Sequence, residues 1–201
     1  MYYNEYEQIW ERLEREGLKV GALAPFNATN RTKNAMFFMP DPWMRTPFVG
    51  PTTLRFINDA LVQVANDYAI NRISPSSILK LGIGAAAHMN WLSIPKYARD
   101  TWRFLRHGRW HRALVADRLL GDTFLSLWRR YRPDFASVGF NAGAHLQHHY
   151  MFSSPFCKTA LETPRWWVKE GVDPVLEALR LYDEFLGDIQ RTDPDARIMF
   201  A

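Results

Sequence analysis

The chain has 201 residues, of which 47% are hydrophobic and 23% are charged, and its formal net charge is +4 at pH 7. This composition is ordinary for a folded globular protein and excludes a disordered chain. A single cysteine, Cys157, excludes an intramolecular disulfide, so we expect a cytoplasmic protein. No apolar run approaches the roughly 18–20 residues of a membrane span, and the polar first residues predict no signal peptide.

The N-terminal segment predicts a helix followed by a strand. Within residues 4–16 the apolar side chains recur at helical spacing and form one stripe. Gly17 ends this helix, and residues 18–25 then form a short apolar strand. A helix that feeds an apolar strand through a glycine is typical of a layered α/β fold.

A polar loop and a proline-rich segment follow the strand. The loop, residues 26–34, contains Asn30 and Arg31, which could bind an anionic substrate. A solvated loop without a ligand is the alternative, because surface loops are polar in any case. Residues 36–51 hold four prolines, which exclude a long helix or a central strand, so we expect an ordered connection there.

Residues 52–132 are predicted to be mainly helical. The 3.6-residue period predicts a helix over 52–72, and Ser74-Pro75 begins a second helix that extends to about Trp91. A further helical region over 93–131 is expected to break near His107-Gly108 and near Gly121.

This last helical region is basic, with ten Lys or Arg and three Asp between Lys96 and Arg132. It could form a surface for an anionic partner, or it could be a helical cap whose basic face is only solvated. We expect no nucleic acid as partner, because no signature of nucleic-acid recognition accompanies the charge.

The most informative stretch begins with a predicted buried strand. Residues 135–141 are short, apolar and partly β-branched. His145, His148 and His149 follow at once and are three of the six histidines in the chain. Because ligands in open α/β sheets bind beyond the carboxyl ends of the strands, we expect these histidines at a functional site.

The C-terminal segment predicts one more helix and one more strand. Asp173-Pro174 begins the helix, residues 192–195 form a turn, and residues 196–201 begin a strand in which the chain stops. We therefore predict an α/β fold with a partial layered sheet, whose strands lie near 18–25, 135–141 and 196–201. Residues 1–51 and 133–201 would belong to the α/β core, and residues 52–132 would form a helical cap inserted into one incomplete domain.

The three histidines could bind a metal ion. On a helix, residues three or four apart share a face, so His145 could pair with His148 or with His149. Zinc accepts imidazole ligands, but a catalytic zinc site needs a third protein ligand, which must come from elsewhere. Asn141 could be only a weak oxygen ligand or a substrate contact. The alternative is that the histidines pack against neighbours or face solvent.

Several segments, taken in order, resemble the interior of a domain of the alkaline phosphatase superfamily, in its type I phosphodiesterase/nucleotide pyrophosphatase branch. The likeness covers most of the chain, although each motif is short. The segments that carry it are Ile9 to Gly21, Met39-Pro-Asp-Pro-Trp43, Arg132 to Asn141 with Gln147-His148 and Tyr150, and Tyr182-Asp-Glu-Phe-Leu-Gly187.

This resemblance implies a metal-dependent hydrolase of phosphate esters, of the phosphodiesterase or phosphatase type, or of sulfate esters. Such enzymes carry two metal ions, usually zinc, and a Thr or Ser nucleophile. In the family a carboxylate and a histidine four residues apart follow a strand like 135–141. This chain can be aligned with that pair in three ways, and each alignment lacks the carboxylate. The two family positions would be taken by Ala144 and His148, by His145 and His149, or by Asn141 and His145.

The resemblance also implies that these residues are an internal fragment. The family's nucleophile lies upstream of a helix like residues 3–16, and its Asp-His-Gly ligands follow a strand like 196–201. From this resemblance we expect an anionic small-molecule ester as substrate. The alternative function is a non-catalytic relative, a binding or scaffold domain that acts through the basic helices of residues 94–132.

Overall fold

The computed structural model describes residues 6–66, 73–107, 110–158, 161, 164, 166–169 and 171–200, and for residues 104–107 it describes the backbone alone. The chain has a mixed α/β fold and divides into two compact units. Unit 1 consists of Met1–Asn90 and Asp122–Gly139, and unit 2 consists of Trp91–Gly121 and Phe140–Ala201.

Unit 1 contains a parallel three-stranded sheet among its described residues. Its strands are β1 (Val20–Leu23), β2 (Phe37–Met39) and β3 (Phe135–Val138), in the order β2-β1-β3. Gly21 pairs with Phe37 on one side and with Ala136 on the other. A Cβ atom on Gly21 would lie 2.5 Å from Cζ of Phe37, so only glycine lets this ring lie across the central strand.

The core of unit 1 lies against this sheet. α1 (Ile9–Arg15) places Trp10 edge-on to the ring of Phe38, with the ring centroids 5.5 Å apart. Phe37 packs in the same edge-on way against Phe124, which lies on the part of α5 (His111–Tyr131) that belongs to unit 1. Aromatic pairs of this geometry stabilise a core beyond their buried area.

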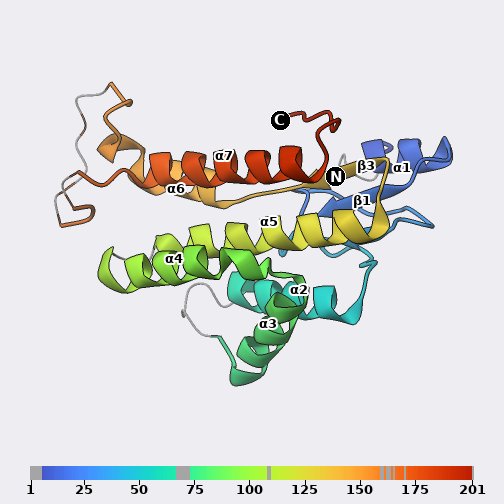
Figure 1. Cartoon of the computed structure of the whole chain (residues 1–201), viewed down its shortest axis with the longest axis horizontal. Coiled ribbons are helices and arrows are strands. Elements are labelled where there is room, and N and C mark those ends of the chain that lie inside the picture. The colour runs from blue at the N-terminus through green and yellow to red at the C-terminus, as the bar shows by residue number, and fades with distance from the viewer. Residues whose placement is uncertain are drawn as a thin grey trace. The chain divides into compact units, whose positions relative to one another are not determined.

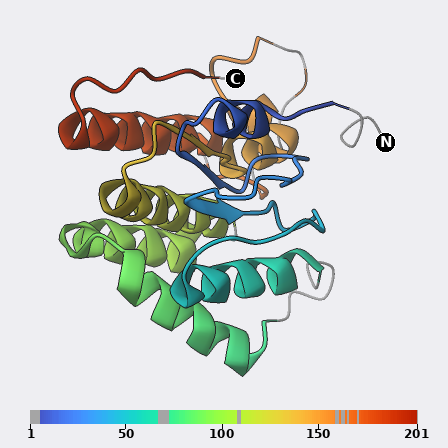
Figure 2. The ribbon, with the colours of Figure 1, turned by 90° about the vertical axis from the view of Figure 1, so that its right-hand side faces the viewer.

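The helices α2 (Thr52–Asn66) and α3 (Pro75–His88) pack together in unit 1 (Figure 2). Ser74 caps α3 by accepting a hydrogen bond from the backbone N–H of Ser77 at 3.1 Å, as the Ser-Pro pair predicts. Gly84 of α3 lies so close to α2 that a Cβ atom would be 2.6 Å from Cγ1 of Ile57. Gly84 thus allows α3 to approach α2 closely at this position.

Unit 2 is helical throughout its described elements, apart from connections. It contains α4 (Ile94–His107), the residues of α5 up to Gly121, α6 (Ala142–Tyr150) and α7 (Pro174–Thr192), with 3₁₀ turns at Trp91–Ser93 and Met151–Ser153. Helices α6 and α7 lie side by side (Figure 1). Asp173 caps α7 by accepting hydrogen bonds from the N–H groups of Val175 and Leu176.

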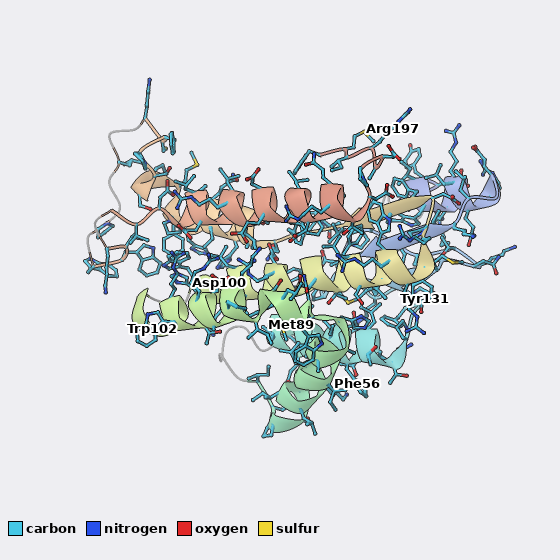
Figure 3. The ribbon with its side chains drawn as sticks, viewed as in Figure 1. Phe56, Met89, Asp100, Trp102, Tyr131 and Arg197 are labelled. Carbon is cyan, nitrogen blue, oxygen red and sulfur yellow. The ribbon has the colours of Figure 1, made fainter. Side chains whose placement is uncertain are left out.

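The core of unit 2 joins three of its helices. Leu114 of α5, Leu146 of α6 and Leu181 of α7 are buried in one apolar cluster. On α4, Asp100 is buried while Trp102 is exposed, and the two side chains point to opposite sides of the helix (Figure 3). Among the described side chains of α4, the buried one is thus the charged Asp100.

The structure confirms most of the predicted elements. The strands predicted near 18–25 and 135–141 contain β1 and β3, and the helix predicted after Asp173-Pro174 is α7. The region predicted as a break at His107-Gly108 separates α4 from α5, although Gly108 lies outside the described residues.

Four predictions of local structure are wrong. Residues 196–200 form no regular secondary structure, and most of their side chains are exposed, so the third predicted strand is absent there. Residues 6–8, where the sequence predicts helix, precede the first helix, which begins at Ile9, and α5 continues through Gly121 without a break. β2 lies within the proline-rich segment where no strand was predicted; it is an edge strand, so it lies where prolines are tolerated.

Candidate functional site

Helix α6 carries the three histidines, and three residues separate its first residue from the end of β3. His145 and His149 lie one turn apart on one face, and their ring centroids are 4.7 Å apart with an interplanar angle of 60°. His148 is exposed and lies about 100° around the helix from His149. The structure thus brings together the His145–His149 pair, one of the two pairings that the sequence left open.

The environment of His145 favours its neutral form. Burial lowers the pKa of this half-buried imidazole, and the charges of His149, His148 and Arg112 lower it further. A neutral imidazole has a lone pair available for a metal ion, whereas an imidazolium has none. The first histidine of the pair is therefore in the protonation state that a metal ligand needs at neutral pH.

A buried carboxylate holds the N-terminus of α6. Asp117 of α5, only 3% exposed, accepts hydrogen bonds from the backbone N–H groups of Asn141 at 3.2 Å and Ala142 at 2.8 Å. The hydroxyl of Tyr182 donates to Asp117 at 2.9 Å and accepts from the N–H of Gly143 at 2.6 Å. Two side chains from other helices thus satisfy three N–H groups that have no partner within α6.

The charges at this helix terminus are unusual. Burial raises the pKa of Asp117 to about 6, although the hydrogen bonds from Ala142, Tyr182 and Asn141 lower it in part. Burial also raises the pKa of Tyr182, and the Asp117 charge adds to this effect, so the phenol stays protonated and remains a donor. The positive end of the α6 dipole faces the carboxylate, which favours this arrangement.

Sequence reasoning missed Asp117 as a positioning residue. A signal existed, because Asp117 lies three residues after Leu114 and four before Gly121, on the helical stripe that the core uses. A charged residue on a buried stripe needs a polar partner inside the protein. The free backbone N–H groups at a helix N-terminus are such a partner for a carboxylate.

The three predicted substrate contacts lie in different surroundings. Asn30 is 2% exposed in unit 1, and its amide donates to the carbonyl of Pro47 at 2.9 Å while its oxygen accepts from the N–H of Thr32 at 3.0 Å. Arg31 forms an ion pair with Glu11 at 2.8 Å. Both residues organise their loop, and their contact with substrate stays a prediction.

Asn141 lies in unit 2 with the histidines and is the residue before α6. Its side chain is exposed and makes no capping hydrogen bond to the helix, while its backbone N–H donates to Asp117. Asn141 therefore lies beside the first turn of the helix that carries His145, and its role toward substrate also stays a prediction.

A complete metal site is not formed within the described residues, where no three side chains of His, Cys, Asp or Glu gather as a metal ion requires. The His145–His149 pair supplies two imidazole ligands, which suit zinc better than a hard cation such as magnesium. The donors that are present thus fit half of a zinc site, and the remaining ligands stay a prediction.

In the part of the chain that the structure describes, no helix combines the length and the apolar character that crossing a membrane requires. No family model matches the chain, and no curated protein and no solved structure matches it either.

Proposed function

We propose that this chain contributes a zinc half-site to a metal-dependent hydrolase of phosphate esters, of the phosphodiesterase or phosphatase type. The observation that carries the proposal is the His145–His149 pair, with ring centroids 4.7 Å apart on the helix that follows β3. The resemblance of the segments around it to the alkaline phosphatase superfamily supports the same reaction class.

The anchoring of α6 supports this proposal in a second way. A side chain that binds a metal ion must be held in place by its surroundings. If the side chain becomes ordered only when the metal binds, the affinity for the metal is lower. Asp117 and Tyr182 hold the first turn of α6 through hydrogen bonds of 2.6–3.2 Å, and His145 lies within two residues of Gly143. The first histidine is therefore carried by a helical turn that two neighbouring helices hold.

The reaction would divide between this half-site and groups elsewhere. Zinc bound by the two imidazoles supplies Lewis-acid polarisation of a phosphoryl oxygen. His145 and His149 would hold the ion, and Asn141, which lies in the same unit, is the proposed contact of the anionic ester. The nucleophile and the missing ligands would come from outside these residues. A cytoplasmic location belongs to the same proposal, because Cys157 cannot form a disulfide within the chain.

The test is a calorimetric titration of the metal-free chain with zinc. We expect one zinc ion per chain, and we expect His145→Ala and His149→Ala each to weaken binding by at least 10-fold, because each removes half of the protein ligands. Gln147→Ala is the matched control, since Gln147 is exposed on the same helix and should leave the affinity unchanged. Equal affinity in all four proteins would contradict the half-site.

The second candidate is a binding or scaffold domain without catalysis, acting through the basic helices. The ion-paired arginines of α4, α5 and α7 favour it, because they gather around one cavity in unit 2. Zinc binding that depends on the histidine pair, together with phosphoesterase activity of a longer protein that contains this chain, would decide for the hydrolase. Anion binding without either property would decide for the binding domain.

A further inference from the structure

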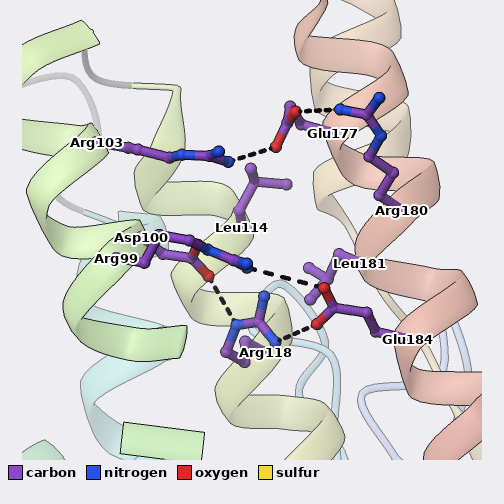
Figure 4. Close-up of a pocket in the computed structure, with 9 residues that line it drawn as sticks. All are labelled: Arg99, Asp100, Arg103, Leu114, Arg118, Glu177, Arg180, Leu181 and Glu184. Carbon is purple, nitrogen blue, oxygen red and sulfur yellow. Dashed lines mark hydrogen bonds and ion pairs between the residues drawn. The ribbon is translucent and has the colours of Figure 1, made fainter. Parts of the chain in front are cut away.

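Unit 2 contains a charged cavity of about 170 Å³ formed by α4, α5 and α7 (Figure 4). One water molecule needs roughly 10–15 Å³ of such volume, so the cavity has room for a polyatomic ion in place of several waters. Its lining consists of Arg99, Asp100, Arg103, Leu114, Arg118, Glu177, Arg180, Leu181 and Glu184.

Arg118 lies at the centre of the ion pairs around this cavity. Its side chain is only 8% exposed, its Nε donates to Asp100 at 2.7 Å, and its Nη1 donates to Glu184 at 3.0 Å. The charges of Asp100 and Glu184 raise its pKa against the effect of burial, so the guanidinium remains charged. A guanidinium held on two sides is fixed in orientation and loses little freedom when it binds a further group.

The carboxylates of the lining already have their partners. Glu177 accepts from Arg103 at 2.8 Å and from Arg180 at 2.7 Å, one with each oxygen. Asp100 accepts from Arg118 and, at 3.2 Å, from Arg99.

Glu184 is paired in the same way. It contacts Lys96 at 3.2 Å in addition to Arg118. Although burial alone would raise the pKa of Glu184, the hydrogen bonds from Arg118 and Lys96 lower it below its ordinary value. Glu184 therefore stays ionised, and all three carboxylates are paired with cations.

The cations, by contrast, keep unused donors. Within the described network, Lys96 and four arginines face three carboxylates, which leaves two positive charges in excess. Among the described residues, Nη2 of Arg118 has no hydrogen-bond partner, although this side chain is more than nine-tenths buried. In Figure 4 this third nitrogen points toward the middle of the lining side chains.

We propose that this cavity binds the phosphate group of a small anionic ligand. Excess positive charge, an unused N–H on the largely buried Arg118 side chain and arginine forks from three helices match a tetrahedral oxyanion, because guanidinium groups bond phosphate oxygens in pairs. The volume suits one phosphate group with a small substituent and not a drug-sized molecule, whose pockets start at about 300 Å³. This site uses none of the three histidines and does not rest on the metal proposal.

The experiment is calorimetry of the chain in a chelating buffer at constant ionic strength, with inorganic phosphate and phenyl phosphate as separate ligands and acetate as a monoanion. We expect both phosphates to bind at one site and acetate to bind at least 10-fold more weakly. If only phenyl phosphate binds, the natural ligand is a phosphomonoester; if both bind equally, free phosphate is sufficient. If neither phosphate binds, or acetate binds as well as phosphate does, the proposal is overturned.

Arg180→Gln and Arg191→Gln provide a matched pair of variants. Both arginines are exposed on α7, with side chains 63% and 69% exposed, and both form an ion pair with a carboxylate three residues earlier. Only Arg180 lines the cavity. We expect Arg180→Gln to weaken phosphate binding by about 10-fold and Arg191→Gln to leave it unchanged.

Arg118→Lys replaces the guanidinium group at the centre of the ion pairs and keeps a positive charge beside the buried Asp100. We expect it to weaken phosphate binding more than Arg180→Gln does, because Arg118 bonds Asp100 and Glu184 through two separate nitrogens and presents a third to the cavity. The single ammonium nitrogen of a lysine lacks this planar fork. Thermal unfolding shows in parallel whether the variant is folded. A folded Arg118→Lys protein that binds phosphate as tightly as the unchanged chain would overturn the site.

Discussion

The carboxylate of Asp117 and the hydroxyl of Tyr182 lie 2.9 Å apart and together hold the N-terminus of α6. The carboxylate comes from α5, the hydroxyl from α7, and the helix they hold carries all three histidines of the candidate site. This relationship connects the packing of unit 2 to the chemistry proposed for it.

The first prediction concerns the pH dependence of stability. Asp117 has a pKa of about 6 in the folded chain, above its ordinary value of 3.8, so folding favours the protonated form. Its stabilising contribution is therefore complete below about pH 3.8 and is lost as the pH rises through about 6. The change in the free energy of unfolding is on the order of 2–3 kcal/mol.

The measurement is urea denaturation from pH 4.5 to pH 8 for the unchanged chain and for Asp117→Asn. Since other groups titrate in the same range, the difference between the two curves is the quantity to compare. We expect Asp117→Asn to lack the decline near pH 6. Parallel curves for the two proteins would show that Asp117 does not titrate there.

The second prediction concerns the phenol of Tyr182. Tyr182→Phe removes the donor to Asp117 and the acceptor for the N–H of Gly143, and leaves both polar groups with one partner fewer. We expect the free energy of unfolding to fall by about 1–3 kcal/mol. Tyr6→Phe is the control, because Tyr6 is exposed, and its stability in the same denaturation measurement should not change.

The third prediction compares two glycines of α3. A Cβ atom at Gly84 would lie 2.6 Å from Ile57 and 2.8 Å from the backbone oxygen of Thr53, whereas a Cβ at Gly82 would meet nothing within 4 Å. We expect Gly84→Ala to destabilise the fold by about 1–3 kcal/mol through overpacking. Gly82→Ala should stabilise it by about 0.5–1 kcal/mol, because alanine is the better helix former.

Thermal or chemical denaturation of both alanine variants gives the comparison directly. Opposite signs for the two substitutions would establish that α3 packs closely against α2 at Gly84 and is open at Gly82. The same sign for both would contradict the packing described here.

The fourth prediction concerns the charges around His145. Burial is the largest cause that lowers the pKa of His145. The charge of His149 is the second cause, and the charge of His148 is the third. We expect the pKa of His145 to rise toward 6.5 in His149→Ala, and to rise by less in His148→Ala, in titrations of the imidazole signals by nuclear magnetic resonance. An unchanged pKa in His149→Ala would place the two rings farther apart than the structure does.

Local signals in the sequence were sufficient for several elements. The Ser-Pro and Asp-Pro pairs predicted the starts of α3 and α7, because the cap side chain and the proline act within one turn. The apolar run at residues 135–141 predicted β3 for a similar reason.

Other features depend on distant residues and could not be predicted in this way. The apolar residues of 196–200 suggested a strand, but a strand needs a neighbour to pair with, and the described sheet has none for this segment. β2 is only three residues long and forms by pairing with β1, so its own sequence carries little signal. The role of Asp117 depends on a helix terminus that lies 24 residues later in the chain.

The central claim is that His145 and His149 bind one metal ion together. The most direct measurement is a zinc titration of the chain followed through the imidazole nitrogen signals by nuclear magnetic resonance. The account predicts that the ring nitrogens of both histidines shift together and reach their end point at one equivalent of zinc, while His88, buried and hydrogen-bonded to Thr53 in unit 1, does not shift. Signals of His145 and His149 that stay unchanged, or that follow zinc independently of each other, would contradict it.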